Sequence, residues 1–308
     1  MISKKKILIT GGGGFLGSHL SNYLLSFNNK IILFDIIFPK KILNTKNKNL
    51  KIFRGNLLIE DSLKKASKGC DYIFHFGGIV GQENFSKNNI KAINTEIIGL
   101  KNVCLAAKLN KVKKIIYNST SGIYDLKEEY NQDLENINPY SYVKKFGEIY
   151  LNNFSIQNKV DILCLRVFNV YGPYQNKSMV IQKFLNSAIQ DKPILIYSKG
   201  KQKRDFIYVD DYVRQAVHKV MKYKGSHTFD VLSGNKISIL KLANLIKKIT
   251  NSNSEVKLVK IKNNFKNFYI HEIKNNLRIN KNLIKPKPNV KLEEGLRLTL
   301  ESFIEKKF

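Results

Sequence analysis

A tyrosine and a lysine four residues apart, Tyr140 and Lys144, carry the clearest chemistry in this chain of 308 residues. Within a helix this spacing places both side chains on one face. A free tyrosine has a pKa of about 10, too high for a base at neutral pH, but a nearby ammonium favours the phenolate. We therefore expect Tyr140 to accept the proton of an alcohol hydroxyl. Taken alone, the same spacing also fits an exposed helical pair with no catalytic role.

A turn rich in hydroxyl groups supplies a third candidate, Thr120. The turn spans Asn118 to Tyr124 and directly follows a predicted strand at residues 114–117. Thr120 could hydrogen-bond the reacting oxygen and shorten its path to Tyr140, which is a positioning and electrostatic role. A run of serine and threonine also fits a plain loop.

Three glycines spaced three apart, Gly11, Gly14 and Gly17, join a predicted buried strand at residues 4–10 to a helix at residues 18–25. Such glycines let the backbone turn tightly, let a pyrophosphate approach the helix N-terminus and let the helix pack close to the strand. The segment therefore predicts a bound nucleotide.

An acidic residue, Asp35, ends the second predicted strand at residues 31–34. A carboxylate about twenty residues beyond a glycine turn can accept hydrogen bonds from the adenosine ribose. It would also repel a 2′-phosphate, and the following Ile36 and Ile37 supply no arginine to bind one. The sequence therefore favours NAD over NADP, and the alternative is that Asp35 only caps a loop.

Strand and helix signals alternate through the first half of the chain, which predicts a doubly wound parallel sheet of the α/β class. The further strands are expected at residues 51–53, 72–76, 114–117 and 160–167, and the helices at 61–68, 91–109 and 140–157. Ligands of such folds bind at the carboxyl ends of the strands. Each of the motifs above lies just past a strand end or on the helix that follows.

The second half is less regular, and a chain of 308 residues is expected to form two lobes, here with a smaller α/β domain at the C-terminal end. Helices are expected at residues 179–190, 209–223, 239–250 and 292–304, and short strands at 194–197, 229–231 and 256–261. We therefore divide the chain into a nucleotide-binding Rossmann domain at residues 1–168 and a mainly substrate-binding domain at 169–308. The stretch 263–288, rich in Lys, Asn and Pro, is expected to be an irregular excursion or a flap over the substrate.

The composition excludes several other classes of protein. The net charge is +29, but only six of the 53 basic residues are arginine, whereas nucleic-acid recognition relies heavily on arginine; we expect no nucleic-acid partner. No apolar stretch is long enough to span a membrane and no signal peptide precedes the first strand, so we expect a cytoplasmic protein. The three cysteines and five histidines show no ligand spacing, which predicts reduced packing cysteines and no metal.

Five segments together resemble the motifs of a known family. They are Thr10 to Gly17, Ser119 to Tyr124, Pro139 to Lys144 with Glu148, Leu165 to Pro173, and Arg204 to Asp211. In this order and over residues 4–250, the chain is similar to the extended short-chain dehydrogenase/reductase family, in its nucleotide-sugar epimerase and dehydratase branch.

The resemblance implies a role for each matching position. Catalysis falls to Thr120, Tyr140 and Lys144. The residues implied for binding NAD are Gly11, Gly14, Phe15, Leu16, Gly17, Asp35, Asn56, Leu57, Phe76, Gly77, Gly78, Asn94, Tyr140, Lys144 and Phe168. Asn56 stands where the family usually has an aspartate near the adenine, and Asn94 matches an asparagine that opens the next helix. The nucleotide sugar is held by Thr120, Asn169 and Arg204, with Arg204 reaching its diphosphate.

Two departures from the family pattern narrow the expected activity. Dehydratases and decarboxylases of this branch carry an acidic residue two places after the catalytic threonine, where this chain has Gly122. The turn therefore looks more like the epimerase or ketoreductase form. A clear Arg-Pro-Gly-Asp motif, which supplies a diphosphate contact in relatives, is also missing between residues 263 and 276. The sequence therefore does not identify the nucleotide or the sugar of the substrate.

We expect an NAD-dependent nucleotide-sugar epimerase that acts at C4 of a UDP-hexose through a transient 4-keto intermediate. The alternatives are an NAD(P)H-dependent reductase of a nucleotide-4-keto-sugar and a catalytically silent nucleotide-binding protein. The resemblance further implies a homodimer, formed through a four-helix bundle of the helices at 91–109 and 140–157.

Overall fold

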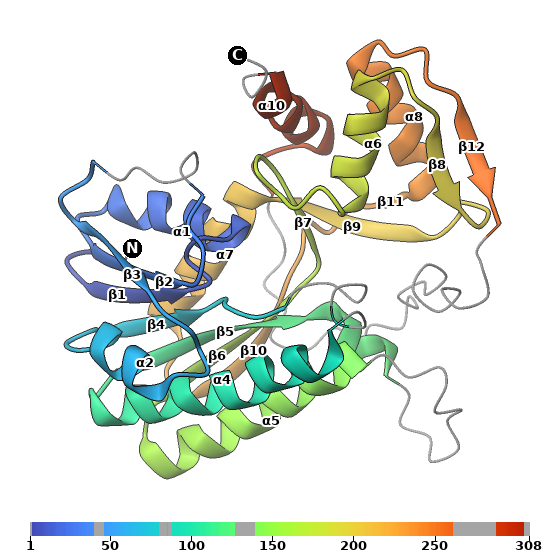
Figure 1. The fold of residues 1–308 in the computed structure, drawn as a ribbon. Coiled ribbons are helices and arrows are strands. Elements are labelled where there is room, and N and C mark those ends of the chain that lie inside the picture. Colours follow the sequence, from blue (N-terminus) through green and yellow to red (C-terminus); the bar gives the residue numbers. More distant parts are fainter. Residues whose placement is uncertain are drawn as a thin grey trace. The chain divides into compact units, whose positions relative to one another are not determined.

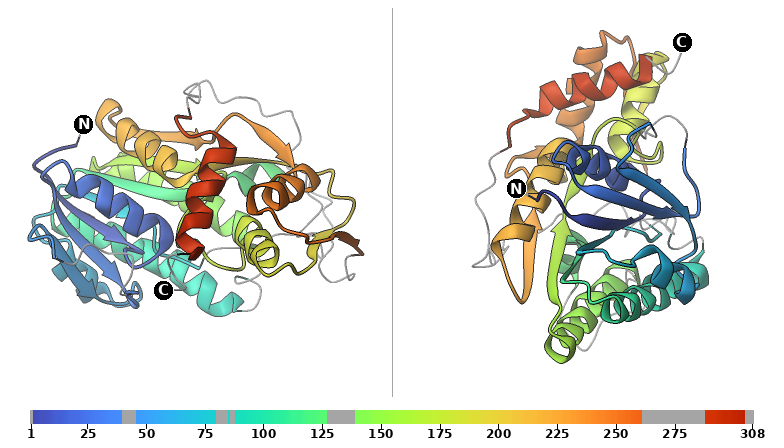
Figure 2. Two further views of the ribbon diagram at one scale, coloured as in Figure 1. Left: turned by 90° about the horizontal axis from the view of Figure 1, so that it is seen from above. Right: turned by 90° about the vertical axis from the view of Figure 1, so that its left-hand side faces the viewer.

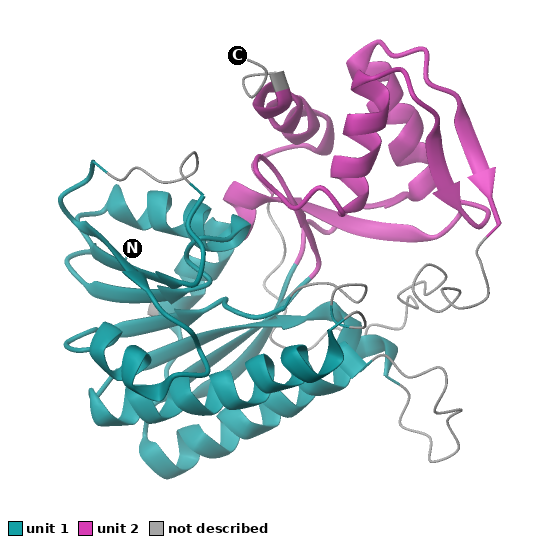
Figure 3. Cartoon of the chain, viewed as in Figure 1, with its two compact units in different colours: residues 1–167, 213–231, 280–283 teal, residues 168–212, 232–279, 284–308 magenta. Residues whose placement is uncertain are grey.

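The computed structural model describes residues 2–39, 46–79, 85, 88–126, 139–260 and 288–304. The chain divides into two compact units, which Figure 3 distinguishes by colour. The first contains residues 1–167, 213–231 and 280–283, and the second contains residues 168–212, 232–279 and 284–308.

A seven-stranded sheet forms the centre of the first unit, in the order β10-β6-β5-β4-β1-β2-β3. All neighbouring strands pair in parallel. The strands are β1 (Lys6–Thr10), β2 (Lys30–Asp35), β3 (Leu50–Arg54), β4 (Tyr72–His75), β5 (Lys114–Thr120), β6 (Asp161–Val167) and β10 (Ser226–Val231). Central strands of a parallel sheet are covered on both faces and read as unbroken apolar runs. Ile7 to Ile9 and Ile115 to Tyr117 are such runs, and each of these side chains is at most 1% exposed.

Helices cover both faces of this sheet (Figures 1 and 2). The helices α2 (Glu60–Ala66), α4 (Asn89–Leu109) and α5 (Pro139–Asn158) lie together on one face, and α1 (Phe15–Leu25) and α7 (Val209–Lys222) lie on the other. The small residues Gly99, Ala106 and Ala107 are buried on α4 and allow this helix to pack closely against its neighbours. The free cysteines Cys104 and Cys164 belong to the same core.

The second unit is built from two small sheets and three helices among its described residues. One sheet has the order β11-β9-β7 and the other pairs β12 with β8. The strands are β7 (Asn169–Tyr171), β8 (Ile194–Tyr197), β9 (Lys203–Tyr208), β11 (Lys236–Ser238) and β12 (Val256–Val259), and the helices are α6 (Val180–Ile189), α8 (Ile239–Thr250) and α10 (Leu292–Ile304). On α8 the buried residues Leu242, Ala243 and Ile246 recur at helical spacing and form its packed face.

The α/β class and the doubly wound parallel sheet predicted from the sequence are confirmed. The sequence pattern missed the strands β7, β9 and β11, because each is short or carries charged residues. The expected division at residue 168 also placed residues 213–231 in the second domain, whereas they belong to the first unit. Of the expected excursion at 263–288, all but residue 288 lies outside the described residues. No helix in the described part of the chain is long and apolar enough to cross a membrane, and the cytoplasmic location stays a prediction.

Candidate active site

The glycine turn follows β1 and leads into α1, with Phe15 and Leu16 opening the helix. Gly11 has a φ of +69°, and a Cβ there would lie 2.6 Å from the backbone nitrogen of Gly77. At Gly17 a Cβ would lie 2.3 Å from the carbonyl oxygen of Gly11. Only glycine therefore allows this close approach of β1, α1 and the loop after β4. The first N–H groups of a helix lack intrahelical partners, and Gly14 caps α1 without a side chain. The turn therefore fits a bound pyrophosphate.

Asp35 lies at the end of the neighbouring strand and faces the same turn. Its Oδ2 accepts a hydrogen bond from the Gly13 nitrogen at 3.1 Å, and its Oδ1 accepts one from the Ile36 nitrogen at 2.7 Å. Burial raises the pKa of the Asp35 carboxyl, and these hydrogen bonds act in the opposite direction. The carboxylate is thus held beside the glycine turn, where a ribose diol would meet it.

The loop after β4 completes this edge of the sheet. The Gly77 nitrogen donates to Thr10 Oγ1 at 3.2 Å, and a Cβ at Gly77 would lie 3.0 Å from Leu57. Phe76, Gly77 and Leu57 are therefore gathered beside the glycine turn, whereas Gly78 lies against Glu96. Their roles toward the cofactor stay predictions. Asn56 uses its side-chain oxygen locally, because Oδ1 accepts a hydrogen bond from the Leu58 nitrogen at 3.0 Å.

Tyr140 and Lys144 lie on the first turns of α5, next to the end of β5. The Lys144 Nζ lies 5.9 Å from the centroid of the Tyr140 ring and 4.8 Å from that of Tyr117. It also donates a hydrogen bond to the Asn118 carbonyl oxygen at 3.0 Å. Thr120 is the last residue of β5 and caps a short 3₁₀ helix at Ser121–Asp125, accepting a hydrogen bond from the Gly122 nitrogen at 3.1 Å.

Gly122 lies between Thr120 and the start of α5. A Cβ at Gly122 would lie 2.6 Å from Ser141 Oγ and 3.4 Å from Thr120 Oγ1. Since Ser141 directly follows Tyr140, the turn after β5 lies against the start of α5. The structure thus brings the Thr120 turn to the tyrosine and lysine, and it leaves little room for a side chain at position 122.

A buried glutamate, which the sequence analysis missed, joins this group. Glu96 Oε2 lies 2.8 Å from Lys144 Nζ, and Oε1 accepts a hydrogen bond from the Ile79 nitrogen at 3.2 Å. Asn94, predicted to open this helix and bind the cofactor, instead lies in the second turn of α4 and is exposed. This expectation about the helix start is wrong because α4 begins at Asn89. The sequence does contain a sign of this buried glutamate. Glu96 lies at helical spacing between Ala92 and Gly99, which are also buried, so a charged residue interrupts the apolar face of α4.

The charges of this group act on one another. Burial lowers the pKa of the Lys144 ammonium, but Glu96, Tyr117 and Tyr140 more than reverse this, so the pKa is raised and Lys144 is charged. Burial raises the pKa of the Tyr140 phenol, Lys144 lowers it and Glu96 raises it again, and the net direction is upward. Lys144 alone therefore does not make Tyr140 a base at neutral pH in this protein.

The remaining predicted residues belong to the second unit. Phe168 is buried, and the Asn169 Nδ2 donates a hydrogen bond to the Asp205 carbonyl oxygen at 3.0 Å. Arg204 lies on β9 and is half-buried. The roles of Phe168, Asn169 and Arg204 toward cofactor and substrate stay predictions.

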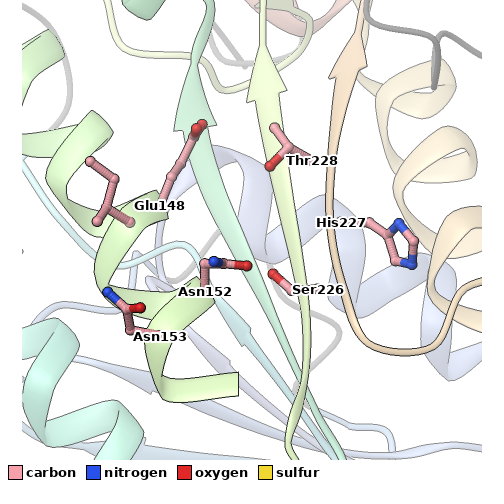
Figure 4. Close-up of a pocket in the computed structure, with 7 residues that line it drawn as sticks. Glu148, Asn152, Asn153, Ser226, His227 and Thr228 are labelled. Carbon is pink, nitrogen blue, oxygen red and sulfur yellow. The ribbon is translucent and has the colours of Figure 1, made fainter. Parts of the chain in front are cut away.

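A polar surface pocket of about 330 Å³ lies elsewhere on the first unit, between α5 and β10 (Figure 4). Glu148 and Asn152 line it from the helix, and Ser226 to Thr228 line it from the strand. Ser226 to Thr228 pair with the first half of β6, whereas Thr120 pairs with Val167 at its end. Because ligands of parallel sheets bind at the carboxyl ends of the strands, this pocket does not mark the active site.

The comparisons with known proteins agree with this geometry. A model of the NAD dependent epimerase/dehydratase family matches residues 7–231. The chain belongs to this family. NAD is therefore its cofactor, and the glycine turn, Asp35 and the loop after β4 form a cradle that fits it.

Relatives in the family act on nucleotide sugars. The chain is 29% identical to a UDP-N-acetyl-alpha-D-glucosaminuronate decarboxylase of Bacillus cytotoxicus, over 98% of each chain. A UDP-N-acetylglucosamine 4-epimerase from Methanobrevibacter ruminantium M1, solved with UDP-N-acetylmuramic acid, is 29% identical with a TM-score of 0.84, over 99% of this chain and 100% of that one. A UDP-glucuronic acid 4-epimerase from Bacillus cereus, solved with UDP-glucuronic acid and NAD, is 26% identical with a TM-score of 0.82, over 98% and 100%. This chain is therefore an enzyme of the NAD-dependent nucleotide-sugar epimerase, dehydratase and decarboxylase group.

Proposed function

We propose that the chain is an NAD-dependent epimerase that inverts C4 of a UDP-hexose. The observation that carries this proposal is the combination of Thr120, Tyr140 and Lys144 at one edge of the sheet with a glycine at position 122. The solved 4-epimerases of similar fold support it, since two of them are 26% or more identical over nearly the whole chain.

Bound NAD supplies an acceptor for the C4 hydride, and the residues of the chain handle the proton. Tyr140 Oη accepts the proton of the C4 hydroxyl as the C4–H bond breaks, which leaves a ketone at C4. Thr120 Oγ1 donates a hydrogen bond to the same oxygen and holds it near the phenol. Lys144 supplies positive charge beside the phenolate. When the ketone has turned its other face, C4 takes the hydride back on that face as Tyr140 returns the proton to the C4 oxygen. The inverted alcohol then forms without net oxidation.

Position 122 argues against dehydration and decarboxylation. Enzymes of those classes carry an acidic group two residues after the threonine, as noted above. Here Ser141 Oγ occupies the space beside Gly122, because a Cβ would approach it to 2.6 Å. The described part of the site therefore offers Thr120 and Tyr140 for proton handling but no carboxylate at this position.

Assay without added cofactor tests the proposal. The purified protein is incubated separately with UDP-glucose, UDP-N-acetylglucosamine and UDP-glucuronic acid, and the products are identified by NMR. We expect interconversion of C4 epimers for at least one of these sugars. A strict requirement for added NADH would identify a reductase instead, and release of CO₂ from UDP-glucuronic acid would identify a decarboxylase.

We also propose a homodimer formed through α4 and α5. The two helices pack side by side on one face of the sheet (Figure 1). Each exposes large apolar side chains: Ile98 on α4 is 41% exposed, and Phe146 and Ile149 on α5 are 45% and 54% exposed. Large exposed apolar side chains on two adjacent helices support an interaction surface there.

A further inference from the structure

Glu96 is a buried carboxylate that the proton transfer described above does not use. Its side chain is 1% exposed and lies between the loop after β4 and the catalytic helix. One oxygen, Oε1, accepts the Ile79 N–H at 3.2 Å, and the other, Oε2, lies 2.8 Å from the Lys144 ammonium. The backbone at Gly78 also approaches it closely, because a Cβ there would lie 2.1 Å from Oε1.

The Lys144 ammonium is consequently held from two sides. The Asn118 carbonyl at the end of β5 accepts its hydrogen bond at 3.0 Å, and the Glu96 carboxylate on α4 pairs with it at 2.8 Å. A buried charge needs such partners, because an unpaired ion in a protein interior is strongly unfavourable. The same two contacts direct the ammonium toward the rings of Tyr117 and Tyr140.

The titratable groups that face Tyr140 and Lys144 in the described structure come from three elements besides α5. They are Glu96 on α4, Tyr117 on β5 and His75 on β4. Burial lowers the pKa of His75 to about 3, with Lys144 adding to the effect, so His75 is neutral near neutral pH. Burial raises the pKa of Tyr117, which is therefore neutral as well. Glu96 is thus the group that opposes the charge of Lys144.

We propose that Glu96 is a positioning residue that fixes the Lys144 ammonium beside Tyr140 and offsets part of its positive charge. This inference rests on the proposed function, since it concerns the residue proposed there as proton acceptor. The field of Lys144 favours the phenolate, and the field of Glu96 disfavours it, so the pair leaves Tyr140 a weaker acid than an unpaired lysine would. The pH at which Tyr140 becomes a base is therefore set by two residues on different helices.

Glu96→Gln tests this proposal, because it removes the charge and keeps the shape. At an effective dielectric constant of about 20, loss of one charge near a buried titratable group shifts its pKa by roughly one to two units. We expect the pKa of Tyr140 to fall by about one to two units in the variant. The measurement is NMR titration of the NAD-loaded protein labelled with carbon-13 at tyrosine Cζ, with the Tyr140 resonance assigned from its loss in Tyr140→Phe.

Activity gives a second readout. The acidic limb of the pH profile of kcat/KM is expected to move to lower pH by the same amount in Glu96→Gln. A purely structural role would lower kcat or stability and leave this limb in place. Glu96→Asp keeps the charge and is expected to leave the Tyr140 pKa within about half a unit of wild type. If Glu96→Gln does not fold, Glu96→Asn takes its place, because asparagine is also uncharged and has a smaller side chain.

Glu148→Gln provides the matched control. Glu148 is a buried carboxylate on α5, but it pairs with Arg166, whose Nη2 lies 2.7 Å from its Oε2. Its loss is expected to leave the pKa of Tyr140 unchanged. An unchanged Tyr140 pKa in a folded Glu96→Gln variant, or an equal shift in Glu148→Gln, would overturn the proposal. Wild-type turnover in Tyr140→Phe would overturn the proposed function instead, and the NMR comparison would still decide the role of Glu96.

Discussion

At the scale of single residues, Tyr140 depends on its surroundings for any role as a base. Its phenol is buried, and burial raises its pKa. The ammonium that would lower this pKa is itself paired with Glu96 at 2.8 Å. The Tyr-x-x-x-Lys spacing therefore identifies which residues meet, whereas the pKa of the Tyr140 phenol also depends on its burial and on Glu96, which the spacing does not contain.

Replacement of Tyr140 by Phe removes the proposed proton acceptor and changes little else in shape. We expect kcat to fall about 100- to 10,000-fold, the usual contribution of general acid–base catalysis. We expect NAD binding to be weakened far less, because the aromatic ring stays and only the hydroxyl is lost. Steady-state assay and isothermal titration calorimetry with NAD measure the two effects. Tyr142→Phe makes the same change two residues further along α5 and is expected to keep turnover near wild type. Comparable losses in both variants would contradict the role of Tyr140.

Gly122 is expected to tolerate a methyl group poorly. In Gly122→Ala the new Cβ would meet Ser141 Oγ at 2.6 Å, and overpacking of this kind costs about 1–3 kcal/mol. Ser141→Ala removes the opposing oxygen. Urea unfolding of the two single variants and the double variant should therefore show a combined loss smaller than the sum of the separate losses. Strict additivity would mean that Ser141 does not limit the space at position 122.

At the scale of elements, the site depends on how neighbouring strands and helices end. Thr10 at the end of β1 forms a hydrogen bond with His75 at the end of β4, with 2.7 Å between Thr10 Oγ1 and His75 Nδ1. The Gly77 nitrogen then donates to the same Thr10 oxygen. These contacts fasten the loop after β4 to the glycine turn, so the order β4-β1-β2 of the sheet places three parts of the NAD cradle side by side.

The buried His75 makes stability depend on pH. Burial lowers the pKa of folded His75 from 6.5 to about 3, so between these values only the unfolded chain takes up the proton. The free energy of unfolding should therefore fall as pH is lowered from about 6.5 toward 3. Denaturant unfolding at a series of pH values measures this slope. His75→Gln cannot titrate and is expected to flatten it, and an equal slope in both proteins would show that other groups cause it.

At the scale of the whole molecule, the two compact units do not follow the order of the chain. Residues 168–212 form part of the second unit, and the chain then returns to the first for residues 213–231. β10 thereby becomes the terminal strand of the seven-stranded sheet, paired with β6. A division of the sequence at one point cannot describe such an arrangement.

The oligomeric state is the prediction that belongs to this scale. Phe146→Glu places a charge on the exposed apolar face of α5 and is expected to convert the proposed dimer into monomers, measured by sedimentation or light scattering. Leu258→Glu on β12, where the leucine is 57% exposed, is the matched control and should leave the dimer intact. A wild-type protein that sediments as a monomer would refute the proposal.

Local sequence patterns were enough to predict the α/β class, the glycine turn, Asp35 at a strand end, and the placement of Tyr140 and Lys144 on one helix face. These features are local, since each depends on residue types a few positions apart along one strand, turn or helix. Sequence spacing also placed Thr120 at a strand end, where parallel sheets bind ligands. Glu96 was missed, although it lies within an apolar stripe at helical spacing, and the sequence gives no sign of its partner Lys144.

Contacts between residues that are distant in the sequence follow from the packing of helices and strands against one another. Glu96 reaches Lys144 because α4 and α5 pack together on one face of the sheet, and the contact joins residues 48 positions apart. β10 joins β6 because hydrogen bonds between strands do not depend on their separation in the chain. Helical periodicity gives the buried face of each element but not what lies opposite it. The charge balance around Tyr140 was therefore decided by packing between elements.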